Sequence, residues 1–573
     1  MPIDLLDTIL TKRGITGPVL RDAFLNADYV THTHDPLLLK GARKAAERII
    51  SAIKNGETIA IFSDYDADGI PGAVVFTDFL KRVKIANPSF TFETLCYIPD
   101  RHEEGFGLSI EAIQELKNKG AQVIITIDCG IADVEPAEHA KKLNIDLIIT
   151  DHHIPGQKLP SAYAIVNPKQ IDCDYPEKML CGSGVAFKLI QAILSIDRFN
   201  IKEGQEKWLL DMVGIATLSD MVPLTGENRV FAKYGLQVMR KSPRLGFIRL
   251  LKETKVMQRF LSEDDIAFMV TPRINAASRM GSATDAFRLL STDDEVEAGM
   301  LTVRLQELND ERKGIVASIT KEAKKRLKAQ GRRVTGSDGE KSKVIVMGDP
   351  DWRPSLLGLV ANALVEEYKC PVFLWGREGG DGIKGSCRSD GSVSVVDIMQ
   401  SVPEATFIAS GGHHMSGGFS VNFDSVHKLH ETIEKAFETA FSKAVPLAAL
   451  ADAELSLDDI NDMTWRIVEQ CGPYGFGNPK PLFLFKRATI RDARQFGKIK
   501  NHLELSFENA RGGTVKAIAF FSSPDDFADN FKTIGTSVGT GLSVNLLAHL
   551  EKSYFMNRPE LRLRIVDILP VEA

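Results

Sequence analysis

The chain reads TIAIFSDYDADG at positions 58–69, so a short apolar run with β-branched residues ends directly in a cluster of carboxylates. Two further runs end in a similar way. Residues 123–127 lead into DCG at 128–130, and residues 147–150 lead into DHH at 151–153. Such runs predict buried parallel strands. Because parallel strands end at the same edge of a sheet, the acidic and imidazole groups should emerge together there, where α/β sheets carry their active sites.

These residue types predict a metal site that acts on phosphorus. Carboxylates alone suit magnesium or calcium, carboxylates with imidazole suit manganese, iron or zinc, and several carboxylates can bridge two ions. Two bridged ions favour in-line attack on phosphorus, because one activates a water and both neutralise charge on the phosphoryl oxygens. Asp220, in LSDMVPL after another apolar stretch, is a fourth candidate position in this sheet. A lone aspartate after a strand often caps a helix or turn, but four clustered positions favour a metal centre.

The order of these motifs resembles the DHH phosphoesterase superfamily, which is named for the motif at 151–153. Further motifs are similar to those of one branch, the RecJ family of bacterial single-strand-specific exonucleases. They are IPDR at 98–101, GFGL at 105–108, PRINAASRMG at 272–281, KGSCRS at 384–389 and GGHHMSGG at 411–418. The resemblance runs from about residue 35 to the C-terminus.

The chain departs from the family pattern at three places. Family members usually have glycine at the position of Ser278 and His-Pro-Gly at the position of Arg353-Pro354-Ser355, and the segment after Gly412-His413 is commonly rich in alanine. These positions fall in loops that we expect to contact substrate. The departures therefore concern the contacts with nucleic acid more than the metal chemistry.

The resemblance implies a metal-dependent 5′-to-3′ exonuclease that hydrolyses single-stranded DNA to 5′-mononucleotides in DNA repair and recombination. It also implies that two ions of manganese or magnesium are bound, with Asp64 the weakest candidate among the ligands Asp64, Asp66, Asp68, Asp128, His152 and Asp220. The catalytic residues would be Asp128, His152 and His153, with His153 near the phosphoryl oxygen or orienting a ligand.

Several residues are candidates for holding the DNA. Arg101 and Arg279 are expected in loops near glycines, and a guanidinium fork matches phosphate, so the resemblance assigns them to the terminal 5′-phosphate and the first nucleotides, with Asn275 nearby. A surface salt bridge is the alternative for each arginine. Further candidates, in glycine-rich stretches where backbone amides can approach phosphate, are Ser386, Arg388 and His413. His413 could instead be a core histidine.

The chain predicts an α/β protein in four parts, as expected for its length. The pattern of apolar runs predicts a parallel-sheet domain with a helical extension at 1–292, a connecting helix at 293–335 and a second α/β domain at 336–445. The resemblance implies that the first is the DHH catalytic domain and that the second is the DHH-associated domain, which clamps substrate. Five short apolar runs in residues 446–573 predict an OB-type β-barrel that binds nucleic acid.

The barrel segment interleaves aromatic and basic residues, as single-strand-binding folds do. Most of its phenylalanines should fill the barrel core, and basic residues near Phe496 and Tyr554 are the better candidates for contact with DNA. The full set is Phe476, Phe483, Phe485, Phe496, Lys498, Lys500, His502, Lys516, Phe520, Tyr554 and Arg558.

Composition excludes several classes of protein. Hydrophobic content of 44% and charged content of 25% are those of an ordinary globular protein, and the sequence shows neither a membrane span nor a signal peptide, so we expect a cytoplasmic protein. Seven cysteines without a C-x-x-C pair predict reduced thiols. The net charge of −6 argues against nonspecific coating of nucleic acid. A basic run could serve phosphate or be a solvated helix face, namely Lys321, Lys324, Lys325, Arg326, Lys328, Arg332 and Arg333.

Two alternatives remain open at this point. A DHH phosphodiesterase acting on short RNA or cyclic dinucleotides would share both α/β domains but would need neither the helical spacer nor the barrel. A nonenzymatic relative should have lost the metal ligands, which this chain retains. We expect a monomer that binds single-stranded DNA and no membrane, to which a helicase or a single-strand-binding protein could deliver substrate.

Overall fold

The computed structural model describes residues 4–329, 344–377, 382–403, 405–441, 451–497, 500–534, 537–553 and 559–571. The chain divides into two compact units. The first is Met1–Asn309 with Asn461–Pro481, and the second is Asp310–Ile460 with Leu482–Ala573. The two units are broader than the four expected parts, so the boundaries near residues 292, 335 and 445 stay a prediction.

The first unit is built around a parallel sheet of five strands in the order β2-β1-β3-β4-β5. The strands are β1 (Thr58–Ser63), β2 (Glu93–Tyr97), β3 (Val123–Ile127), β4 (Asp146–Thr150) and β5 (Ala164–Val166). The three apolar runs of the sequence therefore form the neighbouring strands β1, β3 and β4, and the expected parallel sheet is confirmed.

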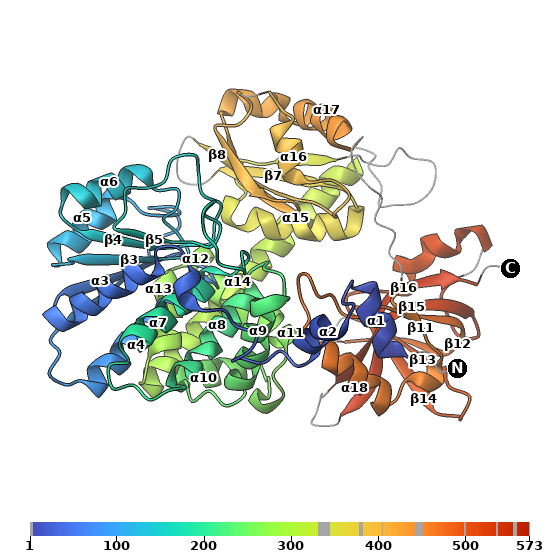
Figure 1. The fold of residues 1–573 in the computed structure, drawn as a ribbon. Helices are drawn as coiled ribbons and strands as arrows, with labels where there is room; N and C mark the ends of the chain where they lie inside the picture. The colour runs from blue at the N-terminus through green and yellow to red at the C-terminus, as the bar shows by residue number, and fades with distance from the viewer. Residues whose placement is uncertain are drawn as a thin grey trace. The chain divides into compact units, whose positions relative to one another are not determined.

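Helices cover both faces of this sheet (Figure 1). One face packs against α3 (Ala42–Asn55), α4 (Gly69–Ala86) and α7 (Gly182–Ile196), and the other against α5 (Ile110–Asn118) and α6 (Val134–Lys142). Strand β1 alternates between the two cores: Ile59 and Ile61 join the first, and Ala60 and Phe62 join the second. Because both faces of the sheet are buried, the sequence of β1 is a continuous apolar run and does not alternate with polar residues.

A helical extension continues the first unit. It contains α8 (Leu210–Ser219), α9 (Gly226–Met239), α10 (Leu245–Glu253), α11 (Glu263–Asp265), a π-helical turn η4 (Ile266–Val270), α12 (Thr271–Met280), α13 (Ala283–Ser291) and the start of α14 (Glu295–Ala329). Helices α8 and α9 approach closely at glycines, since a Cβ on Gly214 would lie 2.7 Å from the Cα of Gly235. The two helices therefore pack closely along the middle of α8, and Asp220 follows the end of that helix.

The segment Asn461–Pro481 belongs to the first unit although it follows the second α/β domain in sequence. It contains α18 (Asp462–Cys471) and lies beside the N-terminal helices α1 (Leu5–Lys12) and α2 (Pro18–Leu25). The buried Arg229 of α9 joins these pieces. Its Nε donates to the Phe24 carbonyl at 2.6 Å, and its Nη2 donates to the Gly472 carbonyl at 2.6 Å.

The second unit contains a mixed sheet in the order β6-β7-β8-β10-β9, in which only β6 and β7 are parallel. The strands are β6 (Ile345–Gly348), β7 (Val372–Arg377), β8 (Ile383–Arg388), β9 (Ala409–His413) and β10 (Ser416–Val421). One face packs against α15 (Pro354–Tyr368) and the C-terminal half of α14, and the other against α16 (Val395–Gln400) and α17 (Leu429–Phe441).

Helix α14 is one continuous helix, as the sequence predicts. Within the basic run, Lys324 pairs with Glu367 and Arg326 pairs with Asp349, so part of this charge neutralises acidic neighbours in the same unit. Arg332 and Arg333 lie outside the described residues.

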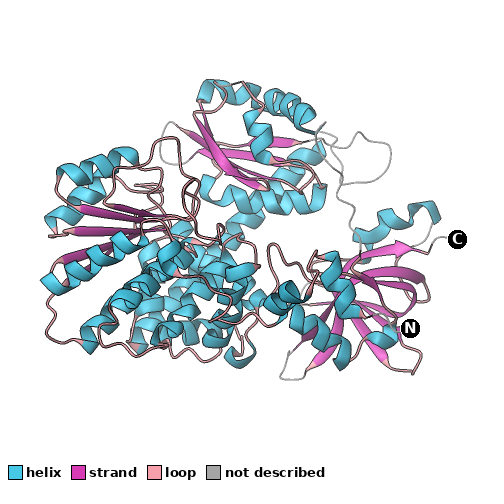
Figure 2. Cartoon of the chain, in the orientation of Figure 1, coloured by secondary structure: helices cyan, strands magenta, loops and turns pink. Residues whose placement is uncertain are grey.

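The C-terminal strands close into a barrel, as Figure 2 shows in magenta. They are β12 (Phe483–Phe496), β13 (His502–Glu508), β14 (Thr514–Ala519), β15 (Ser543–Ser553) and β16 (Glu560–Pro570), with β12 pairing to β15 to complete the ring. The short strand β11 (Ala453–Glu454) pairs with β12 outside the ring. The expected OB-type barrel is confirmed. Phe483 and Phe485 are buried in it, whereas Phe520 is half-buried, and Lys498, Tyr554 and Arg558 lie outside the described residues.

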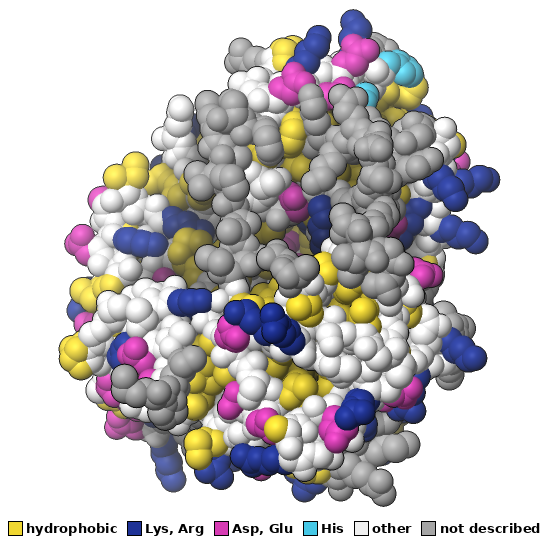
Figure 3. Space-filling view, turned by 90° about the vertical axis from the view of Figure 1, so that its right-hand side faces the viewer, with side chains coloured by type: hydrophobic (Ala, Val, Ile, Leu, Met, Phe, Trp, Pro, Cys, Tyr) yellow, Lys and Arg dark blue, Asp and Glu magenta, His cyan; other side chains and the backbone are white. Residues whose placement is uncertain are grey.

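Surface properties match the composition. Among the described side chains on the face drawn in Figure 3, basic and acidic groups are interspersed. No described helix is both long and apolar enough to cross a membrane. All seven cysteines are free thiols, and six of them are buried.

The contacts of Arg229 predict its effect on stability. Replacing it by methionine should lower the free energy of unfolding of the first unit by about 3 kcal/mol, because buried carbonyls at Phe24 and Gly472 lose charge-assisted hydrogen bonds. Denaturant unfolding of the full chain measures this. Arg249→Met, which removes a more exposed arginine paired with Glu295, is the matched control and should change stability little. Equal effects of the two substitutions would contradict the role of Arg229.

Candidate active site

The segments that follow β1, β3 and β4 meet at the carboxyl edge of the first sheet and line a cavity of about 250 Å³. This is the arrangement that the sequence predicts. The lining residues are Asp64, Tyr65, Asp66, Asp68, Arg101, Phe106, Asp128, His152, His153, Asp220 and Arg279. The metal-ligand candidates and both candidate arginines therefore share one cavity.

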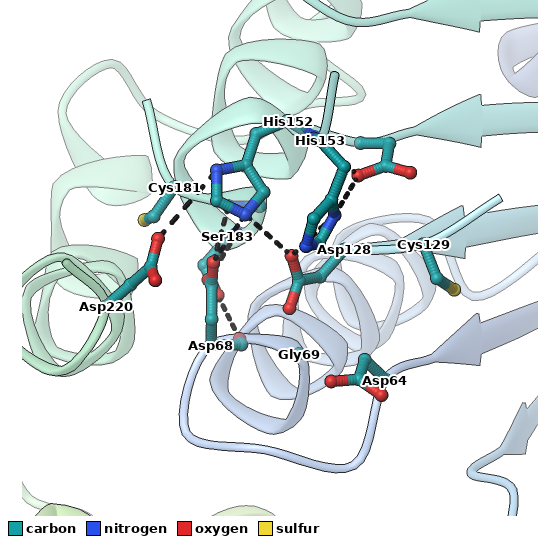
Figure 4. Close-up of polar contacts among 12 residues, drawn as sticks. Asp64, Asp68, Gly69, Asp128, Cys129, His152, His153, Cys181, Ser183 and Asp220 are labelled. Carbon is teal, nitrogen blue, oxygen red and sulfur yellow. Dashed lines mark hydrogen bonds and ion pairs between the residues drawn. The ribbon is translucent and has the colours of Figure 1, made fainter. Parts of the chain in front are cut away.

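His152 lies at the centre of the carboxylates (Figure 4). Its Nε2 is 3.1 Å from Asp128 Oδ1 and 3.8 Å from Asp68 Oδ2, while its Nδ1 is 3.8 Å from Asp220 Oδ2. Both ring nitrogens thus face carboxylate oxygens from different segments of the chain.

Three groups of side chains place ligand atoms within 4.8 Å of one another. They are Asp64 with Asp66 and Asp128, Asp68 with His152 and Asp220, and Asp128 with His152 and His153. The groups overlap at Asp128 and His152, so a pair of ions could share Asp128. Mixed carboxylate and imidazole donors suit manganese and also accept magnesium.

Unpaired buried atoms support a cation at this place. Within the described part of the chain, Asp64 Oδ1, Asp128 Oδ1, His152 Nδ1 and Asp220 Oδ2 are buried without a hydrogen-bond partner. Leaving such atoms unpaired costs free energy, so native structures generally satisfy them. A divalent ion would satisfy these oxygens and the imidazole nitrogen together, and the residues present therefore fit a metal centre.

Electrostatics point the same way. Burial, together with the neighbouring carboxylates, raises the pKa values of Asp64 and Asp128 well above their usual range and that of Asp68 to about 8. Burial also lowers the pKa of His152 to about 4, so its imidazole is neutral, which is the form that binds metals. Without a cation the site retains protons, and a divalent ion has to displace them.

Backbone groups hold the ligands in place. The Gly182 and Ser183 amides at the start of α7 donate to the two oxygens of Asp68 at 2.6 and 2.7 Å, where the helix dipole favours negative charge. A Cβ on Gly182 would lie 2.5 Å from the Cβ of Asp128, so this position needs glycine. Asp128 has a left-handed backbone with φ of 63° and donates its amide to the Thr150 carbonyl.

Asp151 orients His153. The sequence did not predict this role, because the DHH motif indicated only metal ligands. Its Oδ1 lies 2.7 Å from His153 Nδ1, and its Oδ2 accepts from the Ile131 amide at 2.9 Å. Burial opposes a charge on His153, but the Asp151 carboxylate outweighs it and raises the histidine pKa. In the sequence, only its position in the DHH motif indicates a functional role for Asp151. For Gly182 and Ser183 the indication is a glycine-rich segment at the start of a helix.

Three expectations about local structure are wrong. Ser278 is a buried residue of α12, and Pro354 and Ser355 begin α15, so these positions do not lie in loops. Asp220 follows the helix α8 and not a strand of the sheet, because its preceding apolar run is buried on all sides as a helix. Arg279 lies in the last turn of α12 and not in a loop. Both side chains nevertheless reach the cavity. Arg101 does lie in a turn, where its guanidinium is 4.9 Å from the centre of the Tyr65 ring.

The remaining substrate candidates are distributed over both units. Asn275 of α12 accepts a hydrogen bond from the Ala67 amide at 2.9 Å. In the second unit, Ser386 and Arg388 lie on β8, and a Cβ on Gly358 of α15 would lie 2.6 Å from Arg388 Nη2. His413 ends β9, and its side chain is outside the described part of the structure. Contact of these residues with substrate stays a prediction.

Family models match three parts of the chain. The N-terminal domain of the DHH family matches residues 58–217, the DHHA1 domain matches 341–439, and the RecJ OB domain matches 451–567.

Curated relatives match nearly the whole chain. The single-stranded-DNA-specific exonuclease RecJ of Bacillus subtilis (strain 168) is 33% identical over 571 residues, which cover 98% of this chain and 67% of that protein. The protein of the same description from Haemophilus influenzae is 30% identical, over 94% of this chain and 92% of its own length.

Solved structures are similar as well. RecJ from Thermus thermophilus in complex with Mn²⁺ has a TM-score of 0.79 at 27% identity and covers 99% of this chain and 76% of its own. The same protein in complex with Mg²⁺ has a TM-score of 0.72 at 25% identity, with 99% and 75% covered.

The raised carboxyl pKa values predict how pH affects stability. In metal-free protein the folded state retains a proton on Asp68 that the unfolded state releases, so the melting temperature should fall as pH rises from about 6 to about 8. Because Mn²⁺ displaces these protons, the stabilisation by Mn²⁺ should grow over the same range. Thermal unfolding with a chelator and with excess Mn²⁺ measures both. In Asp68→Asn the dependence should be weaker, and a stabilisation by Mn²⁺ independent of pH would refute this account.

Proposed function

Because the chain belongs to the RecJ family of single-stranded-DNA-specific exonucleases, we propose that it is a metal-dependent exonuclease that degrades single-stranded DNA from the 5′ end to 5′-mononucleotides. The observation that carries this proposal is the cavity in which overlapping donor groups share Asp128 beside Arg101 and Arg279. A phosphodiester bond needs both parts, a centre that activates water and cations that hold the phosphate.

We propose that the site holds Mn²⁺ or Mg²⁺, the ions present in the similar Thermus structures, through Asp64, Asp66, Asp68, Asp128, His152 and Asp220. When bound, such ions supply an activated water and neutralise the charge that develops on the phosphoryl oxygens. His153 uses Nδ1 to contact Asp151, which leaves Nε2 to donate a hydrogen bond to a phosphoryl oxygen.

The terminal phosphate is assigned to Arg101 and Arg279. Both line the metal cavity, and stacking of Arg101 on Tyr65 holds its guanidinium beside the carboxylate loop. An always-charged planar donor suits a phosphate that must be held next to several carboxylates. Ser386, Arg388 and His413 of the second α/β domain, and Asn275 of the first unit, are further proposed contacts with the nucleic acid, because they lie in motifs that resemble those of the family.

We assign the strand beyond the first nucleotides to a partly exposed aromatic group on the barrel, here called the barrel cluster and made of Phe496, His502, Phe520 and Phe521. His502 lies 4.9 Å from Phe521 and 5.1 Å from Phe496 between ring centres, and the Arg564 guanidinium is 4.0 Å from the Phe520 ring centre. Phe521 is 79% exposed. Aromatic faces next to cations suit unpaired bases and their phosphates.

A phosphodiesterase for short RNA or cyclic dinucleotides is less well supported, because it would not need the barrel. The helicase, the single-strand-binding protein, the monomeric state and the cytoplasmic location that we expect from the sequence stay predictions. A helicase would be useful because a single-strand enzyme needs unpaired DNA.

The test of the proposed function offers end-labelled single-stranded DNA, duplex DNA and short RNA to the full chain, with Mn²⁺ and with Mg²⁺. We expect processive release of mononucleotides from the 5′ end of single-stranded DNA, and little action on the duplex. Faster hydrolysis of short RNA than of single-stranded DNA would favour the phosphodiesterase, and degradation from the 3′ end would reject the proposed polarity.

Asp128→Asn should lower kcat by more than about a hundredfold while single-stranded DNA binding persists. Even residues that only support metal ligands cost about 10- to 100-fold when removed, and Asp128 is the carboxylate that two of the donor groups share. Turnover and binding are measured on one oligonucleotide. Asp293→Asn, at an exposed position of the same unit, is the control. Asp128 is not a shared ligand if the variant keeps more than about a tenth of the parent activity.

Phe521→Ala should weaken binding of long single-stranded DNA about tenfold, because one stacking surface is lost, while turnover of short oligonucleotides stays unchanged. Binding is measured by fluorescence anisotropy on a long and a short oligonucleotide. Val566→Ala removes an exposed apolar side chain from β16 of the same barrel, outside the barrel cluster, and serves as the control. If both variants bind long DNA alike, the barrel cluster does not contact the strand.

A further inference from the structure

Helix α12 presents three polar side chains at intervals of four residues: Thr271, Asn275 and Arg279. Residues four apart lie on the same face of a helix. The opposite side of α12 faces the core, where Ile274 and Ala277 are buried. One face of a single helix therefore carries a hydroxyl, an amide and a guanidinium in a row.

Each of these side chains meets a different part of the active site. Thr271 Oγ1 is 2.5 Å from Ser219 Oγ, next to the metal-ligand candidate Asp220. Asn275 Oδ1 accepts from the Ala67 amide at 2.9 Å, between the ligand candidates Asp66 and Asp68. Arg279 lines the cavity itself. The row thus contacts two ligand segments and ends in a candidate phosphate-binding residue.

The carboxylate loop depends on the contact with Asn275. Within the loop, Asp66 Oδ1 accepts from the amides of Asp68 and Gly69 at 2.7 and 3.1 Å, so these two donors are satisfied locally. The Ala67 amide instead donates to the side chain of Asn275, which is 208 residues away in sequence. Since the Asp68 side chain is bonded to the start of α7, the loop is fixed from both sides.

A π-helical turn before α12 sets the direction in which the polar face of this helix points. The π-helical turn Ile266–Val270 directly precedes it, and a π turn adds one residue, which rotates the following helix by about 100°. Arg273 then fixes the helix from another side, donating to the Met269 carbonyl at 2.6 Å and to Gln306 of α14 at 2.8 Å. Such π turns are frequent at functional sites.

We propose that α12 is a positioning helix that couples the metal-ligand segments to Arg279, so that binding of the ions and recognition of the 5′-phosphate depend on the same helix face. The proposal rests on the proposed function for the role of Arg279. It assigns Thr271 and Asn275 to the positioning of ligands. Contact of Asn275 with substrate, as the sequence suggests, stays a separate prediction.

The first test titrates Mn²⁺ alone into the full chain, without DNA. Thr271→Val and Asn275→Leu remove one hydrogen bond each and should weaken Mn²⁺ binding about fivefold. Thr271→Ser keeps the hydroxyl and Asn275→Asp keeps an acceptor oxygen, so neither should bind Mn²⁺ more weakly than the parent. Thr302→Val removes a buried hydroxyl of α14 that donates to the Ala298 carbonyl of its own helix, and it should leave the affinity unchanged. Parent-like affinity in both Thr271→Val and Asn275→Leu would overturn the proposal.

The second test measures kcat/KM on 5′-phosphorylated and 5′-hydroxyl single-stranded DNA and compares the ratio of the two. Arg279→Ala defines the loss expected when phosphate recognition fails. Thr271→Val and Asn275→Leu should each lower the ratio toward that value, and Asn275→Leu should lower it no further in an Arg279→Ala background. General destabilisation would reduce both rates and leave their ratio unchanged.

The two tests separate the possible failures. Weaker Mn²⁺ binding with an unchanged ratio overturns the coupling, because α12 would then support the ligands alone. A parent enzyme that treats both ends alike rejects the proposed role of Arg279 and the coupling to it, while the Mn²⁺ titration still decides whether α12 positions the ligands. If Asn275→Leu does not fold, the nearly isosteric Thr271→Val carries both measurements.

Discussion

The structure of the first unit depends on burying several carboxylates in one cavity. Asp64, Asp68 and Asp128 are all buried, and the pKa of each is raised by that burial and by the charges of neighbouring carboxylates. Ionised carboxylates at such separations repel one another strongly where water is scarce. The arrangement is stable only with protons or cations bound, so the same repulsion that makes the site costly creates its affinity for divalent ions.

Holding the buried carboxylates together against their repulsion requires rigid partners around the ligands. The first turn of α7 provides amides to Asp68, Asp151 orients His153, and α12 supports the loop between Asp66 and Asp68. Each of these three contacts acts on a ligand segment and not on the substrate. They hold ligand atoms in place against repulsion, which is the part of a metal site that a description of ligands alone omits.

Distant segments stabilise the same unit. The chain passes through the second α/β domain and returns at Asn461–Pro481, where carbonyls of this segment accept hydrogen bonds from Arg229. The barrel strands that follow belong to the second unit, and they carry the barrel cluster, for which we propose contact with the strand. The metal-ligand candidates and the barrel cluster thus belong to separate cores, each with its own sheet.

The sequence by itself determined the parallel sheet, the edge at which DYDADG, DCG and DHH meet, the second α/β domain and the barrel. Strand periodicity and strand-end chemistry are local properties, and parallel strands necessarily end together. Only the tertiary structure decided that Asp220 and Arg279 come from helices, that Asp151 orients His153, and that Asn275 supports the carboxylate loop. An apolar run buried on all sides does not reveal whether it is helix or strand, and the partner of Ala67 is 208 residues away, so no local pattern could identify it.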